Sequence, residues 1–187
     1  MAGRSKSKPL TRDDWLAGAL ELLEESGVEG IKVLPLSKRL GASRGSFYWH
    51  FRDRADLVAS VLDYWDRWST DSVIALLGQA SGRDPTERIW LLMESVISDR
   101  LNARDLAVRA WALYDTEAER VVARVDRKRL ATIRGLFQEA GFSSRECDAR
   151  ARLLATYLIG AGIVFMDDSP SRRKSLARDR WKLLVGR

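Results

Sequence analysis

Residues 43–51 read SRGSFYWHF, and this stretch decides the fold. Phe47 and Phe51 stand four residues apart, so on a helix they share one face. Leu36 and Leu40 repeat that spacing in the preceding segment and offer an apolar partner surface. The other side chains of the stretch point away from the two Phe, and their polar groups suit phosphate oxygens and base edges.

A four-residue turn, LGAS at residues 40–43, separates the two apolar pairs. Gly41 suits the backbone that ends one helix, and Ser43 suits the N-cap of the next. Helix, short turn and helix form the helix-turn-helix layout, whose second helix enters the DNA major groove. A helix of about seven residues is not stable alone, so an apolar neighbour must hold it in place.

The segment before this motif supplies such a neighbour. Thr11 is a suitable N-cap, and Asp13 and Asp14 follow it at the positive end of a helix dipole. Apolar residues then recur at helical spacing, namely Trp15, Ala19, Leu22 and Leu23. Ser26 and Gly27 end this helix, so the pattern predicts three short helices around one small core.

The segment from Thr11 to Leu57 resembles the DNA-binding domain of the TetR family of transcriptional regulators. The matching residues, in the family's order and without a gap, are Thr11, Ala19, Leu22, Gly27, Val33, Leu36, Gly41, Ser43, Gly45, Tyr48, His50, Phe51 and Leu57. Ile31 and Lys32 replace the family's usual pair of Thr. Pro35 replaces a common acidic residue, and Ser37 replaces a typical Ala. Family members often contact a phosphate at the second Thr, and we expect Lys32 to make that contact by its charge.

We assign ten residues to DNA binding: Thr11, Lys32, Ser43, Arg44, Gly45, Ser46, Tyr48, Trp49, His50 and Arg54. Arg44 is the expected reader of a guanine, because a guanidinium can donate two hydrogen bonds to that base. Ser43, Ser46 and Trp49 are assigned to base edges or thymine methyl groups. Thr11, Lys32, Tyr48 and His50 are assigned to phosphates, with Arg54 and the start of its helix nearby. In the alternative, His50 bonds a backbone carbonyl and Tyr48 packs its ring under the motif, exposing only its hydroxyl.

The distribution of charge agrees with a phosphate-binding surface. The chain carries a net charge of +6. Residues 1–12 hold four bases and no acid, residues 13–29 hold six acids and no base, and residues 30–54 hold six bases and one acid. Each base alone is most simply a solvated side chain, but together they bracket the motif, as a DNA-binding surface requires.

One cysteine, Cys147, and one histidine, His50, limit the chemistry of the chain. They allow no intramolecular disulfide, thiolate metal cluster or histidine-rich site, so we expect neither metal nor cofactor. The sequence also offers no phosphate-binding glycine loop and no serine elbow, which argues against an enzyme. No apolar run approaches the roughly 20 residues of a membrane span, and no signal-peptide core follows the basic start, which predicts a cytoplasmic protein.

Helical spacing beyond the motif predicts an all-α protein of about nine helices. Asp53 and Asp56 have the spacing of a capping box at the start of a helix that runs to about Gly78. Five more helices are predicted over residues 85–101, 103–114, 116–140, 144–166 and 170–184. We predict two domains: residues 1–57 bind DNA and include a flexible basic arm over 1–10, and the resemblance makes residues 58–187 a helical bundle for effector binding and dimerisation.

Aromatic and Met side chains are concentrated in the second domain, where most belong to a core. A subset is predicted to line a ligand pocket between helices: Trp65, Trp68, Trp90, Met93, Trp111, Tyr114 and Tyr157. Three cations, Arg100, Arg104 and Arg109, either face an anionic ligand or form salt bridges at the surface. The sequence does not identify the effector.

Residues 153–165 are apolar almost all round, as in a helix packed between its own core and a partner. TetR-family proteins pair through their last two helices, which implies a homodimer interface at Leu153, Tyr157, Gly160, Ala161, Val164, Leu176 and Trp181. The alternative is a central helix buried within one subunit. Residues 169–187 carry seven bases and one acid and form either a solvated face or a second basic surface.

The sequence therefore predicts a homodimeric repressor that binds a pseudo-palindromic DNA operator through paired recognition helices about 34–36 Å apart. A small-molecule effector in the second domain is expected to release the operator by displacing the helix that begins at Asp53. Two alternatives stay open: an effector-independent regulator or activator of the same fold, and a DNA-binding architectural protein without sequence preference.

Overall fold

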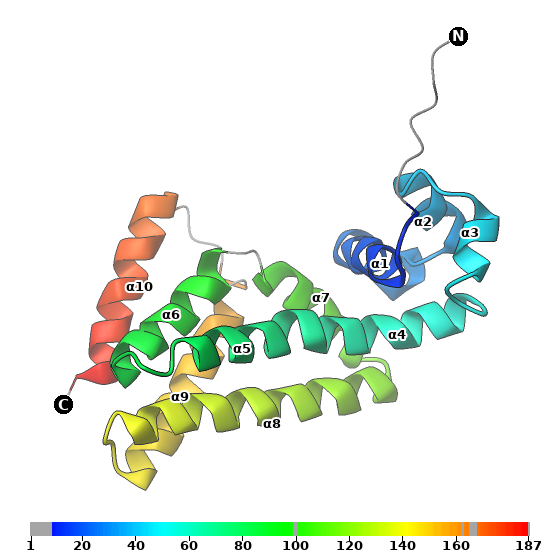
Figure 1. Cartoon of the computed structure of the whole chain (residues 1–187). Coiled ribbons are helices and arrows are strands. Elements are labelled where there is room, and N and C mark those ends of the chain that lie inside the picture. The colour runs from blue at the N-terminus through cyan, green and yellow to red at the C-terminus, as the bar shows by residue number, and fades with distance from the viewer. Residues whose placement is uncertain (1–8, 99–100, 162, 165–167, 187) are drawn as a thin grey trace. The chain divides into compact units, whose positions relative to one another are not determined.

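The computed structural model describes residues 9–98, 101–161, 163–164 and 168–186, and within these the regular structure is entirely helical. Figure 1 shows that α4 and α5 belong to one continuous helical run, so the ten α-helices of the described residues make nine rods, as predicted. The chain forms two compact units that divide between Tyr64 and Trp65, whereas the sequence placed a boundary after Leu57. No described helix is both long and apolar enough to cross a membrane.

The first unit contains three complete helices and the beginning of a fourth. Its elements are α1 (Arg12–Ser26), η1 (Val28–Gly30), α2 (Val33–Arg39), α3 (Arg44–Tyr48) and α4 (Arg54–Asp66), which continues into the second unit. The Thr11 side chain accepts a hydrogen bond from the backbone of Asp14, whose carboxylate accepts one from the backbone of Thr11. This capping box fixes the start of α1, as expected.

Large apolar side chains from all these helices meet in one small core. Trp15, Leu20, Leu36 and Phe47 are fully buried, and the rings of Trp15 and Phe47 meet edge to face with centroids 5.6 Å apart. Gly18 lets α2 come close, because a Cβ at that position would stand 3.0 Å from a methyl carbon of Leu36. The core therefore holds the short α2 and α3 against α1.

The second unit is a helical bundle. It contains a π turn, η2 (Arg67–Asp71), followed by α5 (Ser72–Gln79), α6 (Pro85–Ser98), α7 (Leu101–Ala112), α8 (Thr116–Glu139), α9 (Ser144–Gly160) and α10 (Pro170–Val185). α8 packs against α6, α7 and α9, and α10 packs against α6. The core lies mainly between α6, α8 and α9, where Ile89, Met93, Phe137 and Leu154 are fully buried.

Local sequence fixes most of the helix starts in this unit. Asp84 accepts a hydrogen bond from the backbone of Thr86 at the start of α6, and Ser143 forms a capping box with Glu146 at the start of α9. The helix predicted over residues 144–166 ends earlier, at Gly160. A turn begins there, in which the backbone N–H of Ile163 bonds the carbonyl of Gly160.

Candidate nucleic-acid interface and ligand cavity

The turn between α2 and α3 has the conformation that its sequence predicts. Gly41 adopts a positive φ of 63°, which costs little for a residue without a side chain. The backbone N–H of Ala42 then bonds the carbonyl of Ser37 at 2.9 Å, which closes the end of α2. Ser43 begins α3, because its Oγ accepts a hydrogen bond from the backbone N–H of Ser46 at 3.1 Å.

The side chains of α3 and its C-terminal flank divide sharply between core and solvent. Phe47 and Phe51 are 0% and 2% exposed, and their rings stack at 5.4 Å. Tyr48 and Trp49 are 60% and 87% exposed, and Arg44 is exposed as well. The Tyr48 ring touches Phe47 by its edge, with centroids 5.1 Å apart, yet most of the side chain faces solvent. Two Phe thus hold the segment in place while Arg44 and both polar-tipped rings face outward.

The cations of the first unit fall into two groups. Arg39 pairs with Glu25 and Glu21 on α1, which also raises the pKa of Arg39, chiefly through the hydrogen bonds that Arg39 donates to Glu25. In contrast, Lys32, Lys38 and Arg44 are exposed and have no acidic partner within residues 9–98. The unpaired cations lie on α2, its N-cap position and α3, so positive charge is available beside the exposed rings.

Three residues assigned to phosphates have partners inside the first unit. Arg54 donates from Nε to the carbonyl of Ile31 at 2.6 Å and from Nη2 to the carbonyl of Val28 at 2.8 Å, so it supports the loop before α2. The Thr11 hydroxyl caps α1. The half-buried His50 ring packs 6.5 Å from the Trp15 ring, and in the described structure its nitrogens bond no backbone carbonyl. The basic arm lies almost wholly outside the described residues, which begin at Pro9.

The second unit contains a cavity of about 370 Å³ between its helices. One part of the wall is apolar and includes Val73, Leu77, Leu92, Leu130, Ile133 and Leu158. Another part is polar, with Ser69 and Thr70 from the π turn, Asp105 from α7, and Asp126 and Arg129 from α8. Thr132 on α8 also lines the cavity, as do Arg152 and Thr156 on α9, which are exposed to solvent. A mainly apolar cavity with a few converging polar groups is typical of small-molecule sites.

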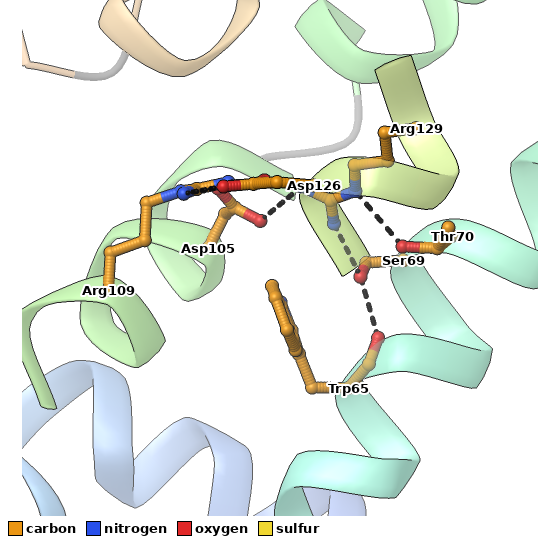
Figure 2. Close-up of polar contacts among 7 residues, drawn as sticks. All are labelled: Trp65, Ser69, Thr70, Asp105, Arg109, Asp126 and Arg129. Carbon is orange, nitrogen blue, oxygen red and sulfur yellow. Dashed lines mark hydrogen bonds and ion pairs between the residues drawn. The ribbon is translucent and has the colours of Figure 1, made fainter. Parts of the chain in front are cut away.

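The polar wall is built from a continuous hydrogen-bond network, which Figure 2 shows and which we name the polar cluster: Ser69, Thr70, Asp105, Arg109, Asp126 and Arg129. Arg129 donates to Asp105 at 2.7 Å and to the hydroxyls of Thr70 and Ser69 at 3.0 Å each. Arg109 donates from Nε to Asp105 at 2.7 Å and from both terminal nitrogens to Asp126 at 2.9 and 2.6 Å. Two carboxylates and two guanidinium groups therefore neutralise one another.

The pKa of Arg109 reflects the ion pairs within this cluster. Burial alone lowers the pKa of Arg109, but the hydrogen bonds and negative charges of Asp126 and Asp105 outweigh that effect and raise the pKa above its ordinary value. Arg109 thus serves as an internal salt-bridge partner. Arg104 lies over the Trp68 ring, 4.7 Å from its centroid, and Arg100 lies outside the described residues.

None of the seven residues predicted to line a pocket lies on the wall of this cavity. Trp65 and Met93 are fully buried, and Trp111 is 9% exposed, so all three belong to the interior. Tyr114 is 92% exposed. The other members lie against cations: Trp68 beneath Arg104, Trp90 beneath Arg178, and Tyr157 beneath Arg180.

Residues predicted for a dimer interface differ in their exposure. Leu153 and Val164 are 64% and 62% exposed, and Ala161 is exposed too. Tyr157, Gly160 and Leu176 are half-buried. Trp181 is engaged within the unit: its Nε1 donates to the carbonyl of Thr86 at 2.8 Å, and its ring meets that of Trp90. Trp181 therefore anchors α10 to α6, whereas Leu153 leaves apolar surface free.

The polar cluster was not predicted from the sequence, although two features of the sequence point to it. Arg129 is four residues from Val125 and four from Ile133, both buried on α8. A cation in an apolar stripe indicates a buried polar contact. Asp105 and Arg109 also have the i,i+4 spacing of an ion pair on a helix.

Together, the capped α3 with its outward Arg44, Tyr48 and Trp49, and the separate bundle with a cavity, form a helix-turn-helix unit followed by a helical bundle. Comparisons with known proteins show which family this arrangement is similar to. The sequence pattern described as bacterial regulatory proteins, tetR family, matches residues 16–61. The HTH-type transcriptional regulator AcrR of Shigella flexneri is 36% identical over 62 residues, which cover 33% of this chain and 29% of that protein. This chain spans only 22% to 54% of the length of such curated relatives.

Solved structures share the fold over nearly the whole chain. A transcriptional regulator from Rhodococcus sp. Rha1 superposes with a TM-score of 0.72 at 19% identity and covers 95% of each chain. AibR, solved in complex with isovaleryl coenzyme A and operator DNA, gives a TM-score of 0.69 at 15% identity and covers 94% of this chain and 98% of that one. Residues 16–61 thus match the helix-turn-helix segment of the tetR family of bacterial regulatory proteins, and the chain as a whole is similar in fold to a transcriptional regulator of the TetR/AcrR family from Thermobifida fusca.

Proposed function

We propose that this protein is a sequence-specific repressor that binds its DNA operator as a homodimer and releases it when a small molecule occupies the cavity of the second unit. The proposal rests on the division of the α3 segment into a buried side and an exposed side. Phe47 and Phe51 anchor the segment in the core, and Arg44 and Trp49 project into solvent beside unpaired cations. A recognition helix needs this combination of rigid support and free polar groups.

Arg44 is the proposed reader of a guanine in each half-site, through two hydrogen bonds to the base. Ser46 and Trp49 add contacts to a base edge or a thymine methyl group. Lys32 and Tyr48 bind phosphates, and Lys32 does so by charge alone. Arg54 supports this surface from behind, because its guanidinium is committed to the carbonyls of Ile31 and Val28.

The second unit takes the effector and pairs the two subunits. The cavity offers a mainly apolar wall with a polar cluster, and AibR, which has the same fold, is known with both a small molecule and operator DNA. Exposed Leu153 and Val164 favour α9 and the turn after it as part of the dimer contact. Because the proposed target is operator DNA, the proposed place of action is the cytoplasm.

Selection of DNA fragments from a random library by the purified protein tests this function. The expected result is enrichment of an inverted repeat whose half-site centres lie about 10 base pairs, or a multiple of one turn, apart. A salt titration on the selected duplex and on a scrambled duplex follows. If both duplexes bind equally at every salt concentration, the protein is a DNA binder without sequence preference and the proposed function is wrong.

A further inference from the structure

The polar cluster beside the cavity restricts the charge of the molecule that can bind there. We propose that the effector is an uncharged, mainly apolar molecule with one hydrogen-bonding end group, and that this end group bonds the Arg129–Asp105 pair. The inference rests on the proposed effector role of the cavity and specifies its ligand class. Three features of the cavity support it: the charge balance of the cluster, its unused hydrogen-bonding groups and the apolar part of the wall.

The charges of the cluster already cancel. Asp105 is shared between Arg129 and Arg109, and Asp126 receives both terminal nitrogens of Arg109. Asp105 is only 6% exposed, so water contributes little to its stabilisation. A ligand with its own charge would add an unbalanced charge to this neutral, largely buried group, which is costly. Arg152 also lines the cavity, but it is exposed to solvent, which screens its charge.

The cluster still has capacity for one neutral polar group. An arginine side chain has five N–H donors, and Arg129 uses three of them, for Asp105, Thr70 and Ser69. In the described structure its two other N–H donors have no partner. Each oxygen of the Asp105 carboxylate accepts one hydrogen bond and has a further lone pair. A hydroxyl, carbonyl or amide can accept from Arg129, and a hydroxyl or amide can also donate to Asp105.

The rest of the cavity matches an apolar body of modest size. Side chains such as Val73, Leu77, Leu92 and Ile133 contribute no hydrogen-bonding group. The volume of about 370 Å³ lies at the lower end of the range for small-molecule sites, about 300–1,000 Å³. A ligand with several separated polar groups would leave some of them unpaired against this wall, which lowers affinity.

The position of the cluster also connects the ligand to α4. Ser69 and Thr70 lie in the π turn that interrupts the continuous α4–α5 run, and both bond Arg129. π turns inside α-helices occur frequently at functional sites. A ligand group that accepts from the two remaining N–H donors of Arg129 binds the same guanidinium as these two hydroxyls, and the helical run that contains them begins with α4 at Arg54 in the first unit. Through Arg129, the end group of the ligand is thereby connected to the helical run that the two units share.

Three probes with the same eight-carbon chain test the ligand class: 1-octanol, octanoate and octylammonium at pH 7. Isothermal titration calorimetry of each probe against the full-length protein without DNA gives the three Kd values. We expect 1-octanol to bind at least about tenfold more tightly than either charged probe, because only the charged probes leave an unbalanced charge beside the cluster. Tighter binding of a charged probe, or no binding of 1-octanol up to its solubility limit, overturns the proposal.

Two charge variants give a second readout that a merely structural role would not produce. Arg129→Gln leaves the cluster one negative charge in excess and is expected to shift preference toward octylammonium. Asp105→Asn leaves one positive charge in excess and is expected to shift it toward octanoate. Arg127→Gln, an exposed position on the same helix, is the matched control and should retain the preference for 1-octanol. Unchanged preference in both folded cluster variants contradicts the proposal.

The wild-type comparison remains decisive if a cluster variant fails to fold. Because the calorimetry uses no DNA, it tests the proposed ligand class separately from the proposed regulatory function. Preference for a charged probe together with specific DNA binding overturns only the ligand class. Equal binding of selected and scrambled DNA overturns the proposed function whichever probe is preferred.

Discussion

Truncation of Phe47 should cost far more stability than truncation of Trp49, although Phe47 lies in α3 and Trp49 is the C-cap residue of the same short helix. The Phe47 ring is fully buried, stacks on Phe51 at 5.4 Å and meets Trp15 at 5.6 Å. Phe47→Ala removes these contacts and leaves a cavity, so we expect a loss of about 3–5 kcal/mol. Trp49 is 87% exposed, so Trp49→Ala should change stability by no more than about 0.5 kcal/mol.

Hydrogen exchange read by mass spectrometry separates the two effects, because it reports opening of the first unit alone. Peptides from α1 should exchange at least about 100-fold faster in Phe47→Ala than in the wild type, whereas Trp49→Ala should leave them unchanged. Trp49→Ala should instead weaken binding to the selected DNA. Similar exchange in both variants would refute the division of this helix into a core side and a DNA side.

Three further predictions concern other parts of the molecule. Lys32→Ala should weaken binding to the selected duplex and to the scrambled duplex equally. It should also reduce the slope of log Kd against log salt by about 1, and fluorescence anisotropy can measure both effects. The backbone N–H of Arg52 lowers the pKa of Asp56. A carboxylate whose pKa is lowered by folding stabilises the protein at pH values above its unfolded pKa, and this stability is lost as the pH falls through the folded pKa. The Tm difference between wild type and Asp56→Asn should therefore disappear in acid. A difference that stays constant with pH would contradict this. Leu153→Glu should produce monomers in light scattering. Leu113→Glu, at a position outside the proposed interface that is 75% exposed against 64% for Leu153, should remain dimeric; a dimeric Leu153→Glu variant would remove α9 from the interface.

Much of the first unit could be predicted from the sequence, because its signals are local. The positive φ of Gly41, the Ser43 cap and the burial of Phe47 and Phe51 each follow from one residue and its near neighbours. The family resemblance was confirmed by the match over residues 16–61. Arg54 was harder to interpret. Its side chain reaches two carbonyls more than twenty residues earlier, and helical periodicity contains no information on such a contact.

The cavity could not be predicted from residue types, since it depends on how the helices of the bundle are rotated. Aromatic side chains were expected on its wall, but in the structure Trp65 is fully buried beneath Arg129, and aliphatic residues line the space. The π turn could not be predicted either, because the sequence of Arg67–Asp71 is that of an ordinary helix. The early end of α9 coincides with two small residues, Gly160 and Ala161, which the sequence analysis placed in the dimer interface.

The most direct test of the account is the effect of Arg44→Ala on the affinity and base preference of the protein. Anisotropy titrations should compare wild type and variant on the selected duplex and on duplexes with one base pair changed in each half-site. We predict a loss of about 1–3 kcal/mol on the selected duplex and a loss of preference at one position per half-site. Unchanged affinity together with unchanged preference at every position would contradict the assignment of α3 as the recognition helix.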